Sequence, residues 1–396
     1  MPPVVDLAAP VRRLSPGHGH YFFGYYDIPA IDPACRRQLC HRVAFRDRFP
    51  RPDDVAELGL LQLDSAAGGF EPFGETLAWN FQQGSMLQWL PGGGSVLYNT
   101  FEDGAYGACV HELTSGARRR LPRPVANVSQ DGRRAVCINM SRVFDFRPGY
   151  GYEELPDPHY DVAAPADDGV WTMDLASGET HFVVSYEQLA ALLNADGARL
   201  EGAKIVINHI TFNPTGDRFL MLVRNFAGAG QPWLTFLLTS DLDGRDIRNH
   251  AAYGMASHYH WRNDREMLFW MNTCPEKRSA LVLVDDESGT LTAVDEGFFR
   301  HDGHCSYSPD GDWILYDSYP DGSTADHFRT LFVYAVPRGE GVVLGRFRSE
   351  AHVRDRIDLR CDLHPRWAPD GRTITFDSIH EGYRGVYAMD LSGVVG

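Results

Sequence analysis

Two alternating patterns of apolar and polar residues recur along the chain. The first is an aromatic or apolar residue, a Pro-Asp-Gly-type turn and then a short apolar strand. Its clearest copies are YSPDGDWILYDS from residue 307, WAPDGRTITFDS from 367 and FNPTGDRFLMLV from 212. Weaker copies are WRNDREMLFWMN from 261, VSQDGRRAVCIN from 128, WLPGGGSVLYNT from 89 and IDPACRRQLCHR from 31. Each copy predicts two antiparallel strands joined by a tight turn.

The second pattern is an alternating apolar strand that ends in a turn with Asp, Ser or Gly. Its seven copies interleave with the first set: GLLQLDSAAGGF, GACVHELTSGAR, GVWTMDLASGET, TFLLTSDLDGRD, ALVLVDDESGTL, LFVYAVPRGEGV and GVYAMDLSG. Four strands per repeat, seven times over, predict an all-β fold, a seven-bladed β-propeller of four-stranded antiparallel blades. We expect one domain over 1–396, with an inserted loop at 140–168 and a short helix at 185–197. The residues before the first repeat are expected to complete the last blade.

Histidine occupies one position of this repeat in four consecutive copies. Three residues before the aromatic, the last four copies carry His209, His258, His304 and His364, whereas the first three carry Ile28, Met86 and Val125. In a propeller this position lies where the innermost strand begins, beside the central channel. Imidazoles that converge from neighbouring strands suit a transition-metal ion. The alternative is that each histidine only hydrogen-bonds the adjacent blade.

Other side chains near these positions offer further candidate ligands. His260 and His301 are reserves for the metal, and Cys305 and Cys361 would make a thiolate zinc site. Strand alternation directs Cys305 away from His304, which argues against its participation.

The strands that follow each turn end on the same face as the histidines. Arg142 and Arg224 lie at two of these ends and suit a carboxylate or phosphate, although a surface ion pair is the alternative for each. Polar neighbours expected to bind substrate on this face are Asn99, Asn208 and Asn225.

A long connection, SRVFDFRPGYGYEELPDPHYDVAAPADDG, follows on the same face. It is too aromatic for disorder, and a connection of this length in a compact domain is usually functional. Its aromatic rings beside Arg147 would suit a sugar-binding lid; the alternative is a loop that merely packs across the end of the propeller.

Charge and composition limit the classes of partner and the cellular location that we expect. The net charge of -16 argues against nucleic acid and against anionic membrane surfaces. Seven scattered cysteines fit reduced thiols, and the proline-containing N-terminus does not fit a signal peptide, so we expect a cytoplasmic protein. We expect no membrane association and a monomer or small homo-oligomer.

The sequence contains no nucleophile elbow, P-loop, dinucleotide fingerprint or CxxC pair. The chemistry that best suits the predicted face is proton abstraction beside a neutralised carboxylate, as in β-elimination of a uronate-containing sugar. There a cation neutralises the carboxylate, a base removes the adjacent C–H proton, and an acid or water protonates the leaving oxygen.

Several motifs resemble those of one enzyme family: GHYFFGYYDIP, NFQQGSMLQWLPG, FRPGYGY, NHITFNPTGDRF, SHYHW, DGHCSYSPDG and DLHPRWAPDG. Together they resemble the seven-bladed propeller polysaccharide lyases: the oligogalacturonate lyases, with their TolB-type turns, and the related ulvan and rhamnose–glucuronate lyases. The resemblance implies a divalent metal (Mn, Zn or Ca) held mainly by histidines. It implies a catalytic role for His209 and an arginine, and it places His258 or His260 on the metal together with His304 and His364.

The front of the chain departs from the ulvan-type pattern. The stretch NFQQGSMLQWLPGGGSVLYNT contains no histidine, so ulvan is not an expected substrate. Tyr150 and Tyr152 are the candidates for the catalytic tyrosine that the resemblance implies, with Arg142 and Arg224 as candidate catalytic arginines.

The leading hypothesis is therefore a lyase that cleaves acidic, uronate-containing oligosaccharides. Because a propeller does not define a function, a non-catalytic scaffold or carbohydrate-binding module stays open. A metal-assisted glycoside or ester hydrolase is a third hypothesis.

Overall fold

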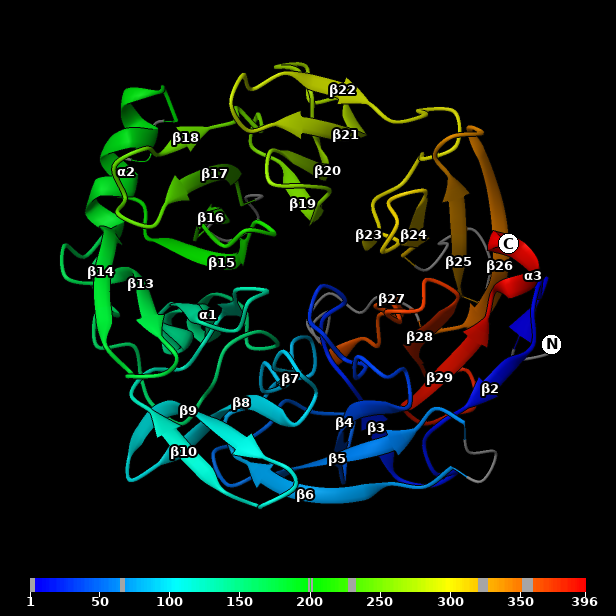
Figure 1. Ribbon diagram of the computed structural model, residues 1–396. Coiled ribbons are helices and arrows are strands. Elements are labelled where there is room, and N and C mark those ends of the chain that lie inside the picture. Colours follow the sequence, from blue (N-terminus) through cyan, green and yellow to red (C-terminus); the bar gives the residue numbers. More distant parts are fainter. Residues whose placement is uncertain are drawn as a thin grey trace.

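The computed structural model describes residues 4–64, 68–198, 200, 202–226, 233–319, 327–350 and 359–396. Within these residues the strands form seven antiparallel sheets arranged radially around a central axis (Figure 1). The predicted seven-bladed β-propeller is confirmed. One expected turn, in GLLQLDSAAGGF, includes residues 65–67, which lie outside the described residues.

The first four blades follow the chain from the innermost strand outward. Blade 1 consists of β3 (His20–Phe22), β4 (Arg37–Val43), β5 (Ala56–Gln62) and β6 (Glu71–Thr76). Blade 2 consists of β7 (Gln88–Trp89), β8 (Ser95–Glu102), β9 (Ala105–Glu112) and β10 (Arg118–Leu121). Blade 3 consists of β11 (Asn127–Val128), β12 (Arg134–Cys137), β13 (Gly169–Asp174) and β14 (Thr180–Ser185). Blade 4 consists of β15 (Ile205–Phe212), β16 (Arg218–Asn225), β17 (Thr235–Asp241) and β18 (Arg248–Asn249).

The remaining blades include strands from the beginning of the chain. Blade 5 consists of β19 (Ala256–Trp261), β20 (Glu266–Asn272), β21 (Ser279–Asp285) and β22 (Leu291–Ala293). Blade 6 consists of β23 (Cys305–Tyr307), β24 (Trp313–Asp317), β25 (Phe328–Ala335) and β26 (Glu340–Arg348), with β1 (Val4–Val5) at its outer edge. Blade 7 consists of β27 (Arg366–Trp367), β28 (Thr373–Ser378), β29 (Gly385–Asp390) and β2 (Val11–Arg13).

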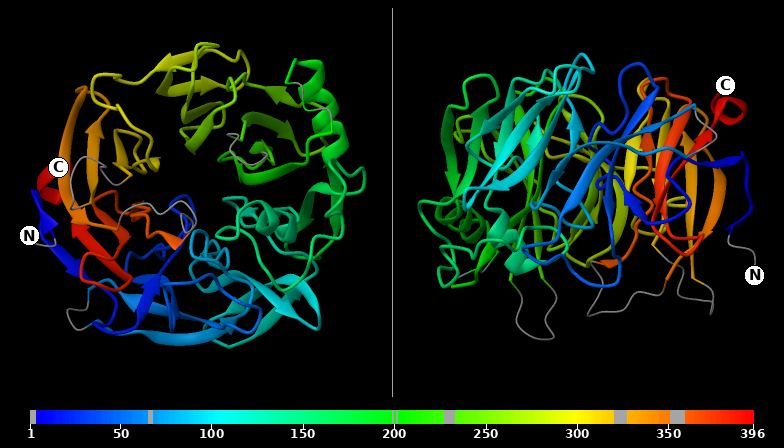
Figure 2. Two further views of the ribbon diagram at one scale, coloured as in Figure 1. Left: turned by 180° about the vertical axis from the view of Figure 1, so that it is seen from behind. Right: turned by 90° about the horizontal axis from the view of Figure 1, so that it is seen from below.

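The ring is closed by pairing between the two ends of the chain. β2 pairs antiparallel with β29, with Val11 opposite Met389, and β1 pairs with β26. The two termini therefore lie near each other on the outer edge of the disc (Figure 2). The segment before the first repeat completes the last blade, as expected from the sequence.

The repeated turn explains why each inner hairpin forms. In blade 6 the Ser308 backbone N–H donates to the Trp313 carbonyl at 2.8 Å, and the Trp313 N–H donates to the Ser308 hydroxyl at 3.0 Å. The Ser308 hydroxyl donates to Asp310, and Gly311 adopts a φ of +79°, a conformation that glycine reaches without steric cost. Serine, aspartate and glycine thus each satisfy a separate requirement of the turn.

Strands in the middle of a blade are apolar because neighbouring blades cover both of their faces. Residues 219–223 of β16 are completely buried. Removing this continuous apolar surface from water is the main contribution that holds adjacent blades together.

In the described residues, two helices lie between strands and a third follows the last strand. α1 (Met140–Phe146) occupies the start of the predicted 140–168 loop and is capped by Asn139, whose side chain accepts from the Arg142 N–H. α2 (Tyr186–Ala195) lies within the predicted 185–197 segment and begins with a capping box formed by Ser185 and Gln188. α3 (Ser392–Val395) follows β29. None of the helices in the described residues is long and apolar enough to cross a membrane.

Candidate metal and catalytic site

The four register histidines meet at one end of the central channel. The ring centroids of His258 and His304 are 4.0 Å apart, and those of His304 and His364 are 4.3 Å apart. His209 stands apart from these three, with the ring of Tyr25 between them: the Tyr25 centroid is 4.9 Å from His209 and 5.2 Å from His364. The repeat position therefore gathers three histidines into a cluster and leaves the fourth beside it.

Local irregularities in strand pairing occur beside two of these histidines and affect the direction of their side chains. The pairing of β15 with β16 shifts register between Ile207 and His209, and the pairing of β19 with β20 shifts between Ala256 and Tyr259. Such bulges reorient a side chain at the end of a strand and are common beside active sites. Periodicity alone does not predict them.

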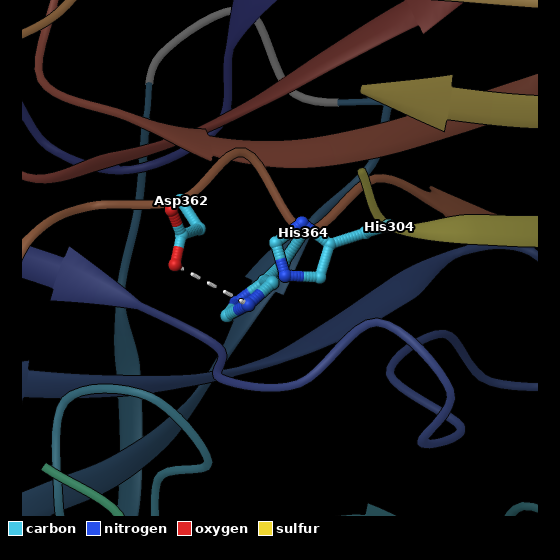
Figure 3. Close-up of side chains that lie close together, drawn as sticks. All are labelled: His304, Asp362 and His364. Atoms are coloured by element: carbon cyan, nitrogen blue, oxygen red, sulfur yellow. Dashed lines mark ion pairs between the residues drawn. The ribbon is translucent and has the colours of Figure 1, made fainter. Parts of the chain in front are cut away.

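His304, Asp362 and His364 form a group that fits a metal ion. One ligand atom from each lies within 4.8 Å of the others, and the side chains converge from two segments (Figure 3). The Nε2 atoms of His304 and His364 are buried and have no hydrogen-bond partner among the residues that the structure describes. A buried polar atom without a partner is costly, and a bound cation would satisfy both nitrogens at once. Two imidazoles and one carboxylate are a donor set used for divalent transition metals.

Carboxylates orient two of the imidazoles. Asp317 lies 2.9 and 3.0 Å from Nδ1 of His304 through its two oxygens, which leaves Nε2 directed at the group. Asp302 lies 2.8 Å from Nδ1 of His258, whose Nε2 is 3.3 Å from the Tyr319 hydroxyl. Carboxylates that hold the outer nitrogen of a histidine are typical of metal sites, because they hold the ring in place and increase its basicity.

The protonation states suit metal binding. Burial and the neighbouring His258 hold the pKa of His304 well below its usual range, and burial and His304 do the same for His364. Burial raises the pKa of Asp362, but the charges of Arg329 and Arg360 outweigh it and hold that pKa well below the usual range. Neutral imidazoles and an ionised carboxylate are the forms that bind metals.

His364 carries a strained backbone. Its φ of +42° lies in the left-handed region, which residues with a side chain rarely adopt. Strain of this kind persists where the surrounding structure enforces it, and it is concentrated at functional sites.

His209 is buried and neutral. Its Nε2 lies 3.4 Å from the Tyr25 hydroxyl, and its Nδ1 lies 3.5 Å from the side-chain nitrogen of Gln83. Burial lowers the pKa of His209 well below its usual range, and the charges of Arg224 and Arg147 lower it further. A neutral imidazole at this position can accept a proton.

Arg224 is a buried cation next to His209. Its guanidinium donates to the side chains of Asn208 and, at 3.1 Å, Thr235, and no carboxylate among the described residues pairs with it. Burial lowers its pKa to about 10, and the charge of Arg147 adds to this effect. A buried guanidinium without an acidic partner is suited to an anionic ligand.

Aromatic rings enclose Arg147 at the edge of the same site. Its guanidinium carbon lies 4.2 Å from the ring centroid of Tyr150 and 5.1 Å from that of Trp233. The Tyr150 ring is 5.5 Å from His209, and its hydroxyl accepts from Arg360 at 3.4 Å. Trp233 is 40% exposed, so one part of its ring surface is open to a ligand.

Three predicted site residues have their polar groups engaged by the fold. Arg142 is fully buried; it pairs with Asp157 at 3.0 Å and donates to the backbone carbonyls of residues 159, 162, 163 and 205. The Asn99 amide donates to the Tyr152 hydroxyl at 2.9 Å and to the Val125 carbonyl at 2.8 Å. This arrangement favours an anchoring role for Arg142, Tyr152 and Asn99 over the direct roles suggested by the sequence.

The two remaining asparagines lie near Arg224. Asn208 accepts from Arg224, and its buried side-chain nitrogen has no hydrogen-bond partner within the described part of the chain. The side-chain oxygen of Asn225 accepts from the Leu234 N–H at 2.6 Å, which holds the start of the next strand. Asn208 is therefore the better placed of the two to meet a ligand.

None of the reserve ligands belongs to the group of His304, Asp362 and His364. His260 is near the other end of the channel, where its Nδ1 accepts from the Tyr307 N–H at 3.4 Å, and burial lowers its pKa to about 4. His301 is exposed. Burial raises the pKa of Cys305 well above its usual value and that of Cys361 to about 11, which favours the neutral thiol over the thiolate at both positions.

Several residues of the site are not apparent from the repeat. Tyr25 and Tyr26 come from the connection between β3 and β4, which turns inward to the centre of the ring (Figure 1). The hydroxyl of Tyr26 is held between the backbone N–H and carbonyl of Tyr259. Two sequence features could have pointed to these residues: the adjacent tyrosines in GYYD, and the Asp-x-His spacing of Asp362 and His364.

The fold and the site together define a class: seven-bladed β-propellers with a histidine and carboxylate cluster at one end of the channel. Two solved structures share this fold over 98% of the chain and 95% of their own length. One is an oligogalacturonate lyase in complex with manganese, at 15% identity and a TM-score of 0.67; the other is an oligogalacturonate lyase from Vibrio parahaemolyticus, at 13% and 0.66.

A third structure shows how widely the architecture is used. The β-propeller domain of the Trilobed protease from Pyrococcus furiosus covers 93% of the chain at 10% identity, with a TM-score of 0.50. No protein-family model matches the sequence, and no curated protein sequence matches it. At these identities the likeness defines the fold alone.

Proposed function

We propose that the protein is a carbon–oxygen lyase that cleaves uronate-containing oligosaccharides by β-elimination. The observation that carries the proposal is the placement of neutral, buried His209 and of Arg224, which has no acidic partner among the described residues, beside the His304, Asp362 and His364 group. The oligogalacturonate lyases that share the fold support the same reaction class. A closer relationship to ulvan or rhamnose–glucuronate lyases stays a prediction, as does a cytoplasmic location.

In the proposed reaction the substrate carboxylate binds near Arg224 and Arg147. Neutralising this charge lowers the pKa of the adjacent C–H bond. His209 removes that proton, the electron pair forms the new C=C bond, and the glycosidic C–O bond on the neighbouring carbon breaks. The leaving oxygen takes a proton from the Tyr150 hydroxyl or from water.

The histidine and carboxylate group would hold the metal. His304, His364 and Asp362 would be ligands, with His258 as a further one. A divalent ion bound there would supply a Lewis acid that withdraws charge from the substrate carboxylate. Asp317 and Asp302 keep two of the imidazoles in place, and burial excludes water from the ligand atoms.

The proposed substrate is acidic although the chain carries a net charge of -16. The local field differs from the global one, because Arg147, Arg224, Arg329 and Arg360 all act on the histidine and carboxylate groups of this site. Local cations of this kind can attract an anion to a protein of overall negative charge.

The test is product analysis on a panel of galacturonate- and glucuronate-containing oligosaccharides incubated with the purified protein and manganese. Elimination gives two fragments whose masses sum to that of the substrate, one of them unsaturated and absorbing in the ultraviolet. Fragments that have gained a water molecule would instead assign a hydrolase. No fragments from any member of the panel would leave the scaffold hypothesis as the better account.

A further inference from the structure

The central channel has a cavity at the end opposite the metal group. It has a volume of about 380 Å³ and lies where the inner strands run into their Pro-Asp-Gly turns. Aromatic side chains line it, namely Trp89, Phe212, Tyr259 and Trp261, and Asp27 contributes a carboxylate. Its size is that of a small-molecule site. Nothing in the proposed elimination uses it.

Asp27 is a carboxylate without a cation. It accepts from the Thr211 hydroxyl at 3.0 Å, and the Tyr259 hydroxyl is a further donor to it. Among the described residues, no lysine, arginine or histidine forms an ion pair with Asp27. The residue is partly exposed, and its partial desolvation raises its pKa to about 6.

The aromatic walls present ring surface rather than polar atoms. The indole N–H of Trp89 donates to the Ala30 carbonyl at 3.1 Å, and that of Trp261 donates to the Thr211 carbonyl at 3.2 Å. The Tyr259 hydroxyl is engaged with Thr211 at 2.9 Å. His260, also in the lining, is neutral because burial lowers its pKa to about 4. The cavity therefore offers apolar and π surface and the neutral polar side chains of Gln88, Asn127, Ser129, Gln130 and Thr211 around one negative charge.

We propose that this cavity binds a small alkylammonium ion, with the ammonium group on Asp27 and the alkyl chain against the aromatic walls. An ammonium donates charge-assisted hydrogen bonds to a carboxylate and is attracted to the faces of Trp and Tyr rings. A neutral ligand would leave the carboxylate uncompensated, and an anion would be repelled by it and by the net charge of -16.

The test compares n-butylammonium with n-butanol, which has the same alkyl chain and no charge, by isothermal titration calorimetry on the whole protein. We expect saturable binding of the amine and weaker or undetectable binding of the alcohol. Equal binding of both would show an apolar cavity only and would overturn the proposal. So would the absence of saturable amine binding. This comparison needs no variant and no catalytic activity.

Two variants test whether the amine binds at Asp27. Asp27→Asn keeps the shape of the side chain and removes its charge, so we expect the amine to bind at least about tenfold more weakly. Asp243→Asn removes the same charge from an exposed position on blade 4 and should leave binding unchanged. Amine binding that survives in Asp27→Asn would place the ligand elsewhere and refute the assignment.

Discussion

Asp317 is the residue whose replacement tests the metal group with the least disturbance to the fold. Both of its oxygens lie within 3.0 Å of Nδ1 of His304, and one also accepts from the His304 backbone N–H at 2.8 Å. Asp317→Asn keeps the size of the side chain but replaces one acceptor oxygen with a donor. His304 then loses the anionic partner that orients its ring and directs Nε2 toward Asp362 and His364.

The expected loss of metal affinity follows from the contact between Asp317 and the Nδ1 atom of His304. Loss of a carboxylate that holds a metal-bound histidine typically weakens metal affinity by about 10- to 100-fold, or about 1.4 to 2.7 kcal/mol. The upper part of this range applies here, because Asp317 is completely buried and no water can replace it.

Metal affinity is measured by titrating manganese or zinc into chelator-treated protein. The matched control is Asp286→Asn, since Asp286 holds a different buried histidine, His250, at 3.1 Å, outside the metal group. We expect Asp317→Asn to bind metal about 100-fold more weakly and Asp286→Asn to bind it normally. Equal metal affinity in Asp317→Asn and the parent would refute the assignment of His304 as a ligand.

Three further predictions concern the edge of the site, α1 and the segment that follows α1. Trp233→Ala removes an exposed ring over Arg147, so we expect KM for an oligosaccharide substrate to rise about tenfold with little change in kcat, measured by steady-state kinetics. Burial raises the pKa of Glu154 from 4.5 to about 7. The folded protein therefore holds this proton more tightly, and wild-type stability falls by about 3 kcal/mol as pH rises from below 4.5 to above 7. Glu154→Gln should lack this loss in urea unfolding. Arg142→Met removes the closer of the two cations that pair with buried Asp157, leaving Lys204 at 3.6 Å, and takes the donor away from several backbone carbonyls. It should cost about 3 to 5 kcal/mol in the same assay.

Each of these predictions has a control and a contradicting result. Phe182 is as exposed as Trp233 but lies on blade 3, and Phe182→Ala should leave KM unchanged; an equal effect of both would show that Trp233 has no special role. Glu154→Gln should match the parent at pH 4, so a constant difference across pH would contradict the titration argument. An Arg142→Met protein as stable as the parent would contradict the anchoring role of that arginine.

The repeat made the propeller predictable, because each blade needs the same turn chemistry and the same apolar alternation. Positions that obey the repeat, such as His209 and His304, could be placed at one end of the channel for that reason. The repeat also led to the prediction that the residues before its first copy complete the last blade.

Features that depart from the repeat could not be found in this way. Tyr25 reaches the site through an irregular connection, and the contact of Asp362 with His364 depends on a strained backbone that no periodicity encodes. As an arginine, Arg142 has the right side chain to clamp an anionic substrate. Its contacts, however, are set by the long connection after α1, which supplies Asp157 and several backbone carbonyls. Composition shows which groups are present, whereas burial determines which of them remain available.

The central claim is that His209 acts as the base in a β-elimination. The most direct measurement follows ultraviolet absorbance of an oligogalacturonate mixture with manganese, for the parent protein and for His209→Gln side by side. The account predicts steady growth of absorbance with the parent and a rate lower by about 100- to 10,000-fold with His209→Gln, at unchanged metal content. Equal rates for the two proteins, or sugar cleavage by the parent without any rise in absorbance, would contradict it.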